Sequence, residues 1–315
     1  MSILGTSNLD VFPLNLGGNT FGWTSDETTS HQVLDAFVQA GGNFVDTADV
    51  YSVWAPGNSG GESEAIIGSW LAKGQRERLI VATKVSQHPE FPGLSATNIA
   101  AAVDASLKRL GTDYIDLYYA HQPDDNTPIA ESAGAFDALV RAGKIRHIGL
   151  SNFSAEQIDE WFAVANEHGF VTPVALQPQY NLVARAEFEN ELAEVSARHQ
   201  LAVLPYFSLA SGFLTGKYRS AADFEGKARA GMAGRYLNEH ALNVVDTLVS
   251  VAAELKVEPA TVALAWLRSR ESIVAPIASA SSVDQLPALM ASATLELSGE
   301  QLEILDAASE PVQVS

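Results

Sequence analysis

Four side chains that could move or stabilise a proton stand at or just after the ends of three successive apolar segments: Asp46, Tyr51, Lys84 and His121. A phenol has a pKa of about 10 and is a poor proton donor at neutral pH unless a nearby cation favours its phenolate. Lys84 could supply that cation, and Asp46 could keep the ammonium charged and oriented. His121 could donate a hydrogen bond to a substrate oxygen or relay a proton. A carbonyl group placed between Tyr51 and His121 would therefore be polarised for hydride attack at its carbon.

These side chains need a scaffold that brings several strand ends together, and the hydrophobic pattern predicts one. Eight short apolar segments typical of buried strands recur at 13–17, 43–48, 79–85, 114–121, 147–152, 173–181, 201–209 and 272–279. Amphipathic segments typical of helices lie between them, at 31–38, 63–71, 95–111, 131–140, 154–162, 187–197, 242–255 and 260–267. Repeated strand–helix alternation over about 250 residues predicts an α/β fold of the (β/α)8 barrel type, with its chemistry at the C-terminal strand ends.

A doubly wound parallel sheet is the main competing fold, because it also alternates strands and helices. Eight strands are too many for one such domain, and no intact Gly-x-Gly-x-x-Gly motif follows the first strand. No linker rich in Pro, Gly or Ser divides the chain, so we expect one domain over residues 1–315.

Three further segments extend the predicted barrel. The first dozen residues predict an extra hairpin that turns at Ser7–Asn8. Two capping boxes predict helix starts. One is formed by Ser154 and Gln157, and the other, which begins a C-terminal helix, by Ser298 and Gln301. The long insertion at 219–237 has no clear strand, and long loops of this kind often cover a site; its cations are Arg219, Lys227, Arg229 and Arg235.

The composition excludes several classes of function. Lys and Arg number 19 against 38 Asp and Glu, so the formal charge of −19 disfavours nucleic acid and anionic membranes as partners. The absence of Cys removes disulfides, thiolate metal sites and cysteine nucleophiles, and the seven His show no metal-ligand spacing, so no metal is expected. The N-terminus does not resemble a secretory signal and no apolar run approaches the ~20 residues of a membrane span, so we expect a cytoplasmic protein.

Several motifs together resemble the aldo-keto reductase family, and within it the bacterial branch that includes the potassium-channel β-subunits. The similarity covers nearly the whole chain, from 4–22 to 276–286. The motifs that carry it are NFVDTADVY at 43–51, TK at 83–84, DLYYAH at 116–121, GLSNF at 149–153, LQPQYNL at 176–182 and ASGFLTGKY at 210–218. The resemblance implies an NAD(P)H-dependent oxidoreductase that interconverts an aldehyde or ketone and the corresponding alcohol.

The resemblance also implies a role for individual residues. Tyr51 would be the general acid in reduction, tuned by Asp46 and Lys84, while His121 would orient the carbonyl. The nicotinamide nucleotide would lie across the barrel mouth, with Tyr206 stacked on its ring. The residues that would contact the cofactor are Gly18, Asn19, Asp46, Ser151, Asn152, Gln177, Tyr206, Phe207, Ser208, Leu209, Ala210, Ser211, Lys217, Ser279, Ser281 and Gln285.

The adenine end of this site departs from the family pattern. The family often has Pro-Gly where Ala278 and Ser279 stand, and Arg or Lys near Ser281. A missing cation weakens the case for a 2′-phosphate, although Lys217 and the insertion could supply one, so NADP(H) is favoured and NAD(H) stays possible. Gln285 could instead complete a capping box with Ser282.

The substrate is not readable from the sequence. Trp23, Trp54 and His88 follow the relevant strands and could form an aromatic wall for a small carbonyl or alcohol, or could be packing residues. A second hypothesis is a nucleotide-binding regulatory or sensor module with incidental turnover, against which the intact set of four side chains argues. A lyase that uses Lys84 as a Schiff-base amine is disfavoured, because Asp46 would keep that amine charged. The sequence leaves the oligomeric state open.

Overall fold

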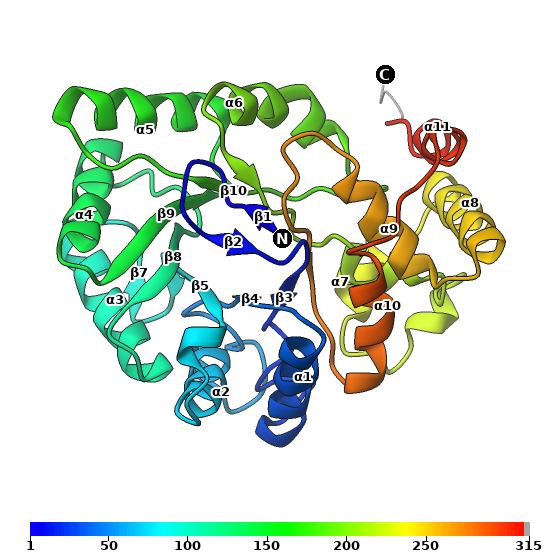
Figure 1. Ribbon diagram of the computed structural model, residues 1–315, viewed down its shortest axis with the longest axis horizontal. Helices are drawn as coiled ribbons and strands as arrows, with labels where there is room; N and C mark the ends of the chain where they lie inside the picture. The colour runs from blue at the N-terminus through cyan, green and yellow to red at the C-terminus, as the bar shows by residue number, and fades with distance from the viewer. Residues whose placement is uncertain (312–315) are drawn as a thin grey trace.

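The computed structural model describes residues 1–311, and its centre is one curled sheet of eight parallel strands (Figure 1). Around the sheet, the strands follow the order β11-β10-β9-β8-β5-β4-β3-β12. Val203 and Ile273 form a parallel bridge, and the Ile277 N–H donates to the Pro205 carbonyl, so the two ends of the sheet meet. The prediction of a (β/α)8 barrel is confirmed, with all eight predicted strands in their places. Their bounds are β3 Asn15–Gly17, β4 Phe44–Asp46, β5 Ile80–Val85, β8 Ile115–Ala120, β9 Ile145–Ser151, β10 Ala175–Gln177, β11 Ala202–Val203 and β12 Ile277–Ala278.

Helices surround this sheet on its outside (Figure 1). The longer ones are α1 Glu27–Gln39, α2 Glu62–Leu71, α3 Ala96–Leu110, α4 Ile129–Arg141, α5 Ala155–His168, α8 Glu239–Leu255 and α9 Pro259–Arg268. Shorter ones are α6 Ala193–Arg198, α7 Ala230–Gly234 and α10 Leu286–Ala291, and α11 Gly299–Ala308 ends the described chain. The predicted helix over 187–197 begins with a wider turn at Phe188–Leu192 before α6. The insertion contains only a short 3₁₀ turn at Ala221–Phe224 and α7, without a strand, as predicted.

Both predicted capping boxes are present. The Ser154 side chain accepts from the Gln157 N–H and the Gln157 side chain accepts from the Ser154 N–H, which satisfies two free donors at the start of α5. Ser298 and Gln301 do the same for α11. Local sequence therefore fixes where these two helices begin.

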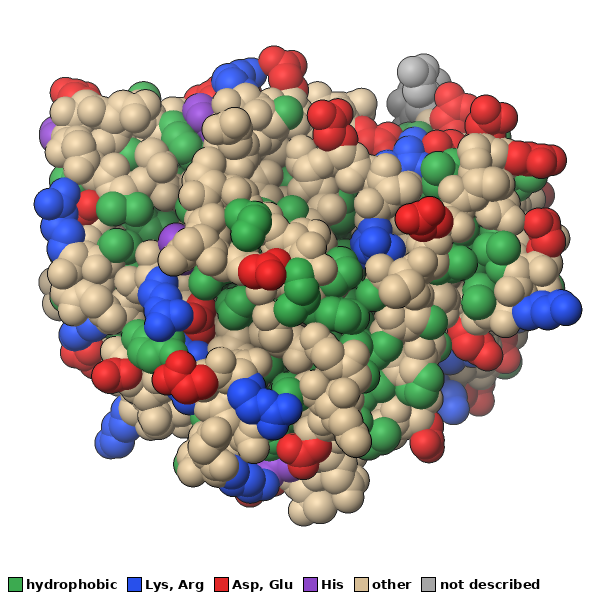
Figure 2. Space-filling model, viewed as in Figure 1, with side chains coloured by type: hydrophobic (Ala, Val, Ile, Leu, Met, Phe, Trp, Pro, Cys, Tyr) green, Lys and Arg blue, Asp and Glu red, His purple; other side chains and the backbone are tan. Residues whose placement is uncertain are grey.

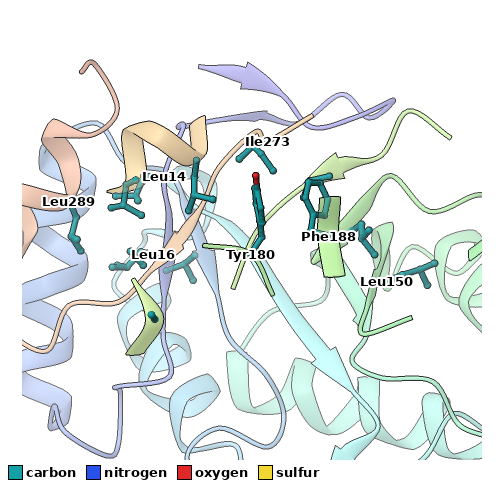
Figure 3. Packing of buried hydrophobic residues seen from close by; sticks show 14 of the residues in the cluster. Leu14, Leu16, Leu150, Tyr180, Phe188, Ile273 and Leu289 are labelled. Atoms are coloured by element: carbon teal, nitrogen blue, oxygen red, sulfur yellow. The ribbon is translucent and has the colours of Figure 1, made fainter. Parts of the chain in front are cut away.

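The strands bury side chains on both faces, because alternate residues point inward and outward. On the outer face, apolar residues pack between sheet and helices, among them Leu14, Leu16, Leu150, Tyr180, Phe188, Ile273 and Leu289 (Figure 3). On the inner face, small residues such as Ala82, Ala175 and Ala202 leave room for Phe44 and Tyr119. The barrel is thus a filled core rather than a channel.

The predicted N-terminal hairpin closes one end of the barrel. Strands β1 (Ser2–Ile3) and β2 (Asp10–Val11) pair antiparallel and lie across the barrel opening that faces the viewer (Figure 1). Leu4, Leu9 and Val11 from this hairpin join the inner apolar cluster. Hydrophobic side chains are visible around the hairpin at the centre of this face (Figure 2). With this end sealed, the opposite end is left for a site.

No helix within residues 1–311 combines the length and the apolar character that crossing a bilayer requires.

Candidate functional site

The four predicted side chains, called the quartet below, come from three neighbouring strands. Asp46 ends β4, Lys84 lies near the end of β5, and His121 follows β8 directly. Tyr51 lies in the loop after β4, whose backbone is tied to β5 by a hydrogen bond from the Asp49 N–H to the Lys84 carbonyl. Because neighbouring parallel strands end at the same edge, the sheet places the whole quartet at the C-terminal mouth of the barrel.

Lys84 is the centre of the quartet. Its Nζ lies 2.6 Å from Asp46 Oδ2, 2.7 Å from the carbonyl oxygen of Thr47, and 3.1 Å from Tyr51 Oη. A lysine ammonium has three protons to donate, so these contacts use all of its donors. The side chain of Lys84 is fully buried. The ammonium is therefore fixed in one orientation, with one proton aimed at the phenol oxygen of Tyr51.

Burial and the neighbouring charges shift the pKa values of Lys84 and Tyr51 in opposite directions. Burial lowers the pKa of Lys84, but the Asp46 carboxylate and the Tyr51 hydroxyl outweigh it, and the net pKa is raised. Burial raises the pKa of Tyr51 more than the Lys84 charge lowers it, so the phenol keeps its proton at neutral pH. The Lys84 charge lowers the pKa of the phenol, as expected, but burial has the larger effect, so the net pKa is raised.

His121 faces Tyr51 across the mouth. The two ring centroids are 6.2 Å apart and the ring planes are inclined by 71°. Burial, with a smaller contribution from the Lys84 charge, lowers the pKa of His121 well below its usual value. The imidazole is thus neutral at pH 7 and has one N–H to donate. Its Nδ1 is buried without a hydrogen-bond partner among the residues that the structure describes.

A second layer of polar side chains comes from the ends of β9 and β10. Ser151 Oγ donates to the Gln177 carbonyl at 2.8 Å, and Gln177 Nε2 donates to Asp46 Oδ1 at 2.8 Å. Asn152 Nδ2 donates to the His121 carbonyl at 2.7 Å and to Ser151 Oγ at 3.1 Å. Ser151, Asn152 and Gln177, which the resemblance places in contact with the cofactor, thus lie together and contact two members of the quartet.

The segment after β11 forms a tight, unusual backbone. Tyr206 Oη donates to Asn152 Oδ1 at 2.8 Å, which ties this segment to β9. Phe207, Ala210, Ser211 and Gly212 all have positive φ, between 48° and 95°. Left-handed residues of this kind turn successive backbone N–H groups toward one side, a geometry that suits an anion. The Ser211 hydroxyl is buried and has no partner within residues 1–311, so it is free for a ligand.

Three cations of the insertion and its preceding loop gather near this segment. Burial lowers the pKa of Lys217, and the charges of Arg229 and Lys227 lower it further. Burial also lowers the pKa of Arg229. None of Lys217, Lys227 and Arg229 forms an ion pair with an acidic side chain in the described part of the chain. Mutual repulsion without a counter-charge favours the binding of an anion between them.

The ends of β3 and β12 complete this side of the mouth. Asn19 Oδ1 accepts from Ser279 Oγ at 2.6 Å and from Arg229 Nη2 at 3.5 Å. The Gly18 N–H donates to the Asp46 carbonyl at 2.7 Å, and a Cβ on Gly18 would lie 2.8 Å from Ser63 Oγ, so the chain needs glycine there. Segments more than 200 residues apart in the sequence thus meet at Asn19.

The alternative prediction, that Gln285 completes a capping box with Ser282, is wrong. Ser282 precedes the short turn at Val283–Gln285 but makes no side-chain cap. Gln285 Oε1 instead accepts from the Ser281 N–H at 2.9 Å, and Gln285 Nε2 donates to Ser281 Oγ at 3.2 Å. Ser281 and Gln285, two residues of the predicted adenine end, are therefore hydrogen-bonded to each other at the surface.

The predicted aromatic wall is only partly formed. Trp54 packs edge-on against Tyr51 at 5.6 Å and against Trp23 at 5.8 Å between centroids, and it is 45% exposed. His88 is different, because it is buried, packs on Phe91, and accepts the Glu90 N–H at its Nδ1. The two tryptophans therefore stand beside the phenol, whereas His88 has a structural task in the hairpin of β6 (Gln87–His88) and β7 (Phe91–Pro92).

Two groups near the quartet carry no clear signal in the sequence. The Thr47 carbonyl holds Lys84, but any residue at this position would offer the same backbone oxygen. Asp49 is buried, and neither of its carboxylate oxygens has a hydrogen-bond partner among residues 1–311. Burial raises the pKa of Asp49 well above its usual value, and the nearby Glu64 adds to the shift.

The surface also has a hollow away from the mouth. An open hollow of about 720 Å³ lies at the opposite end, beside the starts of β8 and β9. There the Tyr114 ring lies between the guanidinium groups of Arg76 and Arg146, which both pair with Asp116. In residues 1–311 no group of three or more His, Asp or Glu side chains is arranged to hold a metal ion.

Comparison with known proteins agrees with this geometry. A sequence profile of the Aldo/keto reductase family matches residues 13–310. The chain is 36% identical to Protein tas of Escherichia coli strain K12, over 96% of this chain and 95% of that protein. It is 35% identical to a probable voltage-gated potassium channel subunit beta of Oryza sativa subsp. japonica, over 90% of this chain and 88% of that protein. It is 33% identical to norsolorinic acid reductase stcV of Emericella nidulans, over 94% of this chain and 78% of that protein. The barrel and these relatives together show that the chain is a member of the aldo/keto reductase family, a family of oxidoreductases.

Proposed function

We propose that this chain is an NAD(P)H-dependent oxidoreductase that interconverts an aldehyde or ketone and the corresponding alcohol, acting as one domain. The observation that carries the proposal is the position of the Lys84 ammonium, which lies between Asp46 and Tyr51 with every proton donated. Such an arrangement stabilises a phenolate, which is the species that Tyr51 becomes when it gives its proton to a substrate oxygen.

The quartet divides the work of proton transfer. The nicotinamide, when bound, supplies the hydride that the carbonyl carbon receives. Tyr51 gives its proton to the carbonyl oxygen, and Lys84 stabilises the phenolate that remains. Asp46 keeps Lys84 charged. The neutral His121 donates a hydrogen bond to the same substrate oxygen and orients the carbonyl. In the oxidation direction the phenolate accepts the proton back.

The residues at the mouth fit a nicotinamide nucleotide, which members of this family generally use. Ser151, Asn152 and Gln177 would hold the carboxamide, and Tyr206 would stack on the ring. The turn from Phe207 through Ser208 and Leu209 to Ala210 and Ser211 offers backbone N–H groups and the free Ser211 hydroxyl to the pyrophosphate. The rest of the nucleotide would be lined by Gly18, Asn19, Ser279, Ser281 and Gln285.

We favour NADP(H) over NAD(H). Lys217, Lys227 and Arg229 form a cluster of positive charge, and its members have no ion-pair partner within the described chain. A 2′-phosphate would relieve the repulsion between them, whereas the 2′-hydroxyl of NAD(H) would not. The loop therefore offers the cation that is missing near Ser281.

The first test is a fluorescence titration of the purified protein with NADPH and with NADH, followed by a panel of aldehydes and ketones. Trp23 and Trp54 near the mouth provide the intrinsic signal. We expect tighter binding of NADPH and turnover of at least one carbonyl. Binding without turnover of any carbonyl would favour a nucleotide-binding regulatory module instead, and failure to bind either nucleotide would refute the proposal.

A further inference from the structure

Gln177 makes a contact that a role in holding the cofactor does not require. It is the last residue of β10, only 2% of it is exposed, and its Nε2 lies 2.8 Å from Asp46 Oδ1. Asp46 Oδ2 lies 2.6 Å from Lys84 Nζ. Because Asp46 is a carboxylate, only the N–H of the amide can face it. The two oxygens of Asp46 are thus held by two different donors, one on each side.

The contact constrains the direction of the Lys84 ammonium. A carboxylate held at one oxygen can rotate about its side-chain bonds, whereas one held at both oxygens is fixed. If Asp46 turned, only the Thr47 carbonyl would still hold the Lys84 ammonium, and attraction to the displaced carboxylate would draw Nζ away from Tyr51 Oη, which now lies 3.1 Å from it. Gln177 is itself anchored, because its carbonyl accepts from Ser151 Oγ at 2.8 Å and the two residues are paired across β9 and β10.

We propose that Gln177 is a positioning residue for proton transfer, which holds the Asp46 carboxylate so that Lys84 stays directed at the Tyr51 hydroxyl. This inference rests on the proposed function, since it assigns Gln177 a part in the same reaction. It uses one amide proton of Gln177; the amide also faces the buried Tyr119 hydroxyl of β8, and Oε1 remains available to the cofactor. The two roles are therefore compatible and can be separated by experiment.

The sharpest variant is Gln177→Glu, which keeps the length of the side chain. When the new carboxyl group is protonated, its O–H can donate to Asp46 Oδ1 in place of the amide N–H. When it ionises, two buried carboxylates repel each other beside Lys84. We expect kcat of this variant to be highest at low pH and to fall as the pH rises toward neutrality, whereas kcat of the wild type should stay level in this range, because the pKa of Tyr51 lies above it.

Gln177→Met removes the donor at every pH. Loss of a hydrogen bond to a charged group predicts a kcat roughly ten-fold lower or more, without a new limb in the pH profile. The dissociation constant of NADPH, measured by fluorescence in each variant, separates this loss from weaker binding of the nucleotide. A residue that only contacts the cofactor would change the dissociation constant and leave the pH dependence of kcat unaltered.

Gln301→Glu is the matched control. Gln301 Nε2 donates to Glu254 Oε1 at 3.0 Å between α11 and α8, so the same change creates a second carboxylate pair away from the mouth. We expect this variant to keep the pH profile of kcat seen in the wild type. A new limb in both Glu variants would mean that the effect is general and not specific to Asp46.

Thermal unfolding of the cofactor-free protein gives a readout that needs no turnover. In Gln177→Glu the buried acid has a raised pKa in the folded state, so its stabilising, protonated form is lost as the pH rises. The thermal midpoint should therefore fall with rising pH relative to the wild type.

Two outcomes would overturn the inference: a wild-type kcat in Gln177→Met, or a pH profile of Gln177→Glu that parallels the wild type. A wild-type protein that turns over no carbonyl would instead refute the proposed function, and the unfolding series would still report whether a carboxyl group at position 177 has a raised pKa in the folded protein.

Discussion

At the scale of single residues, the proposed mechanism assigns the proton to Tyr51 and its tuning to the other members of the quartet. Tyr51 keeps its proton because it is buried, and Lys84 stands ready to stabilise the phenolate once the proton has left. An environment that raises the pKa of the resting phenol and stabilises the charged form through one directed contact suits a donor that must hold its proton until substrate arrives.

Tyr51→Phe removes only the transferable proton. We expect kcat for carbonyl reduction to fall by about 10²- to 10⁴-fold, the usual contribution of general acid catalysis, with nucleotide affinity nearly unchanged. Steady-state kinetics and a fluorescence titration measure the two quantities. Tyr114→Phe, at the opposite end of the barrel beside Arg76 and Arg146, is the control and should keep its turnover. Unchanged turnover in Tyr51→Phe would end the proposed role of the phenol.

His121 should make the stability of the fold depend on pH. Its pKa in the folded protein is well below that of the unfolded chain, because burial disfavours the imidazolium. The unfolded state therefore binds more protons below about pH 6.5, and the free energy of unfolding falls as the pH falls from there.

The His121→Asn variant should lose less stability on acidification than the wild type. We expect the difference to approach about 1 kcal/mol per pH unit below pH 6.5, since one proton corresponds to at most about 1.4 kcal/mol per unit. Urea unfolding at pH 7 and pH 5.5 measures it, and the comparison of variants cancels contributions from other groups such as Asp49. Parallel losses in the two proteins would mean that His121 titrates as in the unfolded chain.

At the scale of elements, the proposed preference for NADP(H) depends on the loops after β11 and β12. Lys217, Lys227 and Arg229 belong to one long stretch of chain, and Arg229 reaches Asn19 after β3. In the proposed binding mode, the cation that the sequence lacks near Ser281 would come from this different loop. Recognition of a phosphate depends on charge and reach rather than on a fixed position in the chain.

Lys217→Ala should weaken the binding of NADPH about ten-fold or more and that of NADH much less, because only NADPH carries the 2′-phosphate. Paired fluorescence titrations measure both dissociation constants. Lys108→Ala on the exposed face of α3 removes a charge without touching the mouth and serves as the control. Equal losses for the two nucleotides would show that Lys217 does not contact the phosphate.

At the scale of the whole molecule, the two ends of the barrel have different tasks. The N-terminal hairpin seals one end with Leu4, Leu9 and Val11, and the quartet occupies the other. The inner apolar cluster, which includes Phe44, lies between them. The apolar packing of the hairpin and the proposed chemistry therefore lie at opposite ends, as barrel enzymes in general arrange them.

Leu4→Ala tests this division. Leu4 is fully buried against the inner cluster, so its truncation should cost about 2–5 kcal/mol of the free energy of unfolding. Denaturant unfolding measures this loss, and the affinity for NADPH at 25 °C should remain within two-fold of the wild type. A large loss of affinity without a loss of stability would show that the hairpin acts on the mouth.

The sequence by itself determined the elements and the types of group at the strand ends. Strand and helix periodicities are local, so eight strands, their helices and the capping boxes at Ser154 and Ser298 could be predicted before any contact was known. Asp46, Lys84 and His121 follow from the same reasoning, because parallel strands in one barrel must end at one mouth.

Only the tertiary structure decided which atoms meet. The Gln177 donor on Asp46, the Thr47 carbonyl on Lys84 and the meeting of Arg229 with Asn19 join segments separated by 37 to 210 residues. The sequence likewise did not predict the burial of His88 or the hydrogen bond between Gln285 and Ser281. Such contacts depend on how the barrel closes and on the path of each loop. Both are set by the packing of the whole chain, and no local pattern records them.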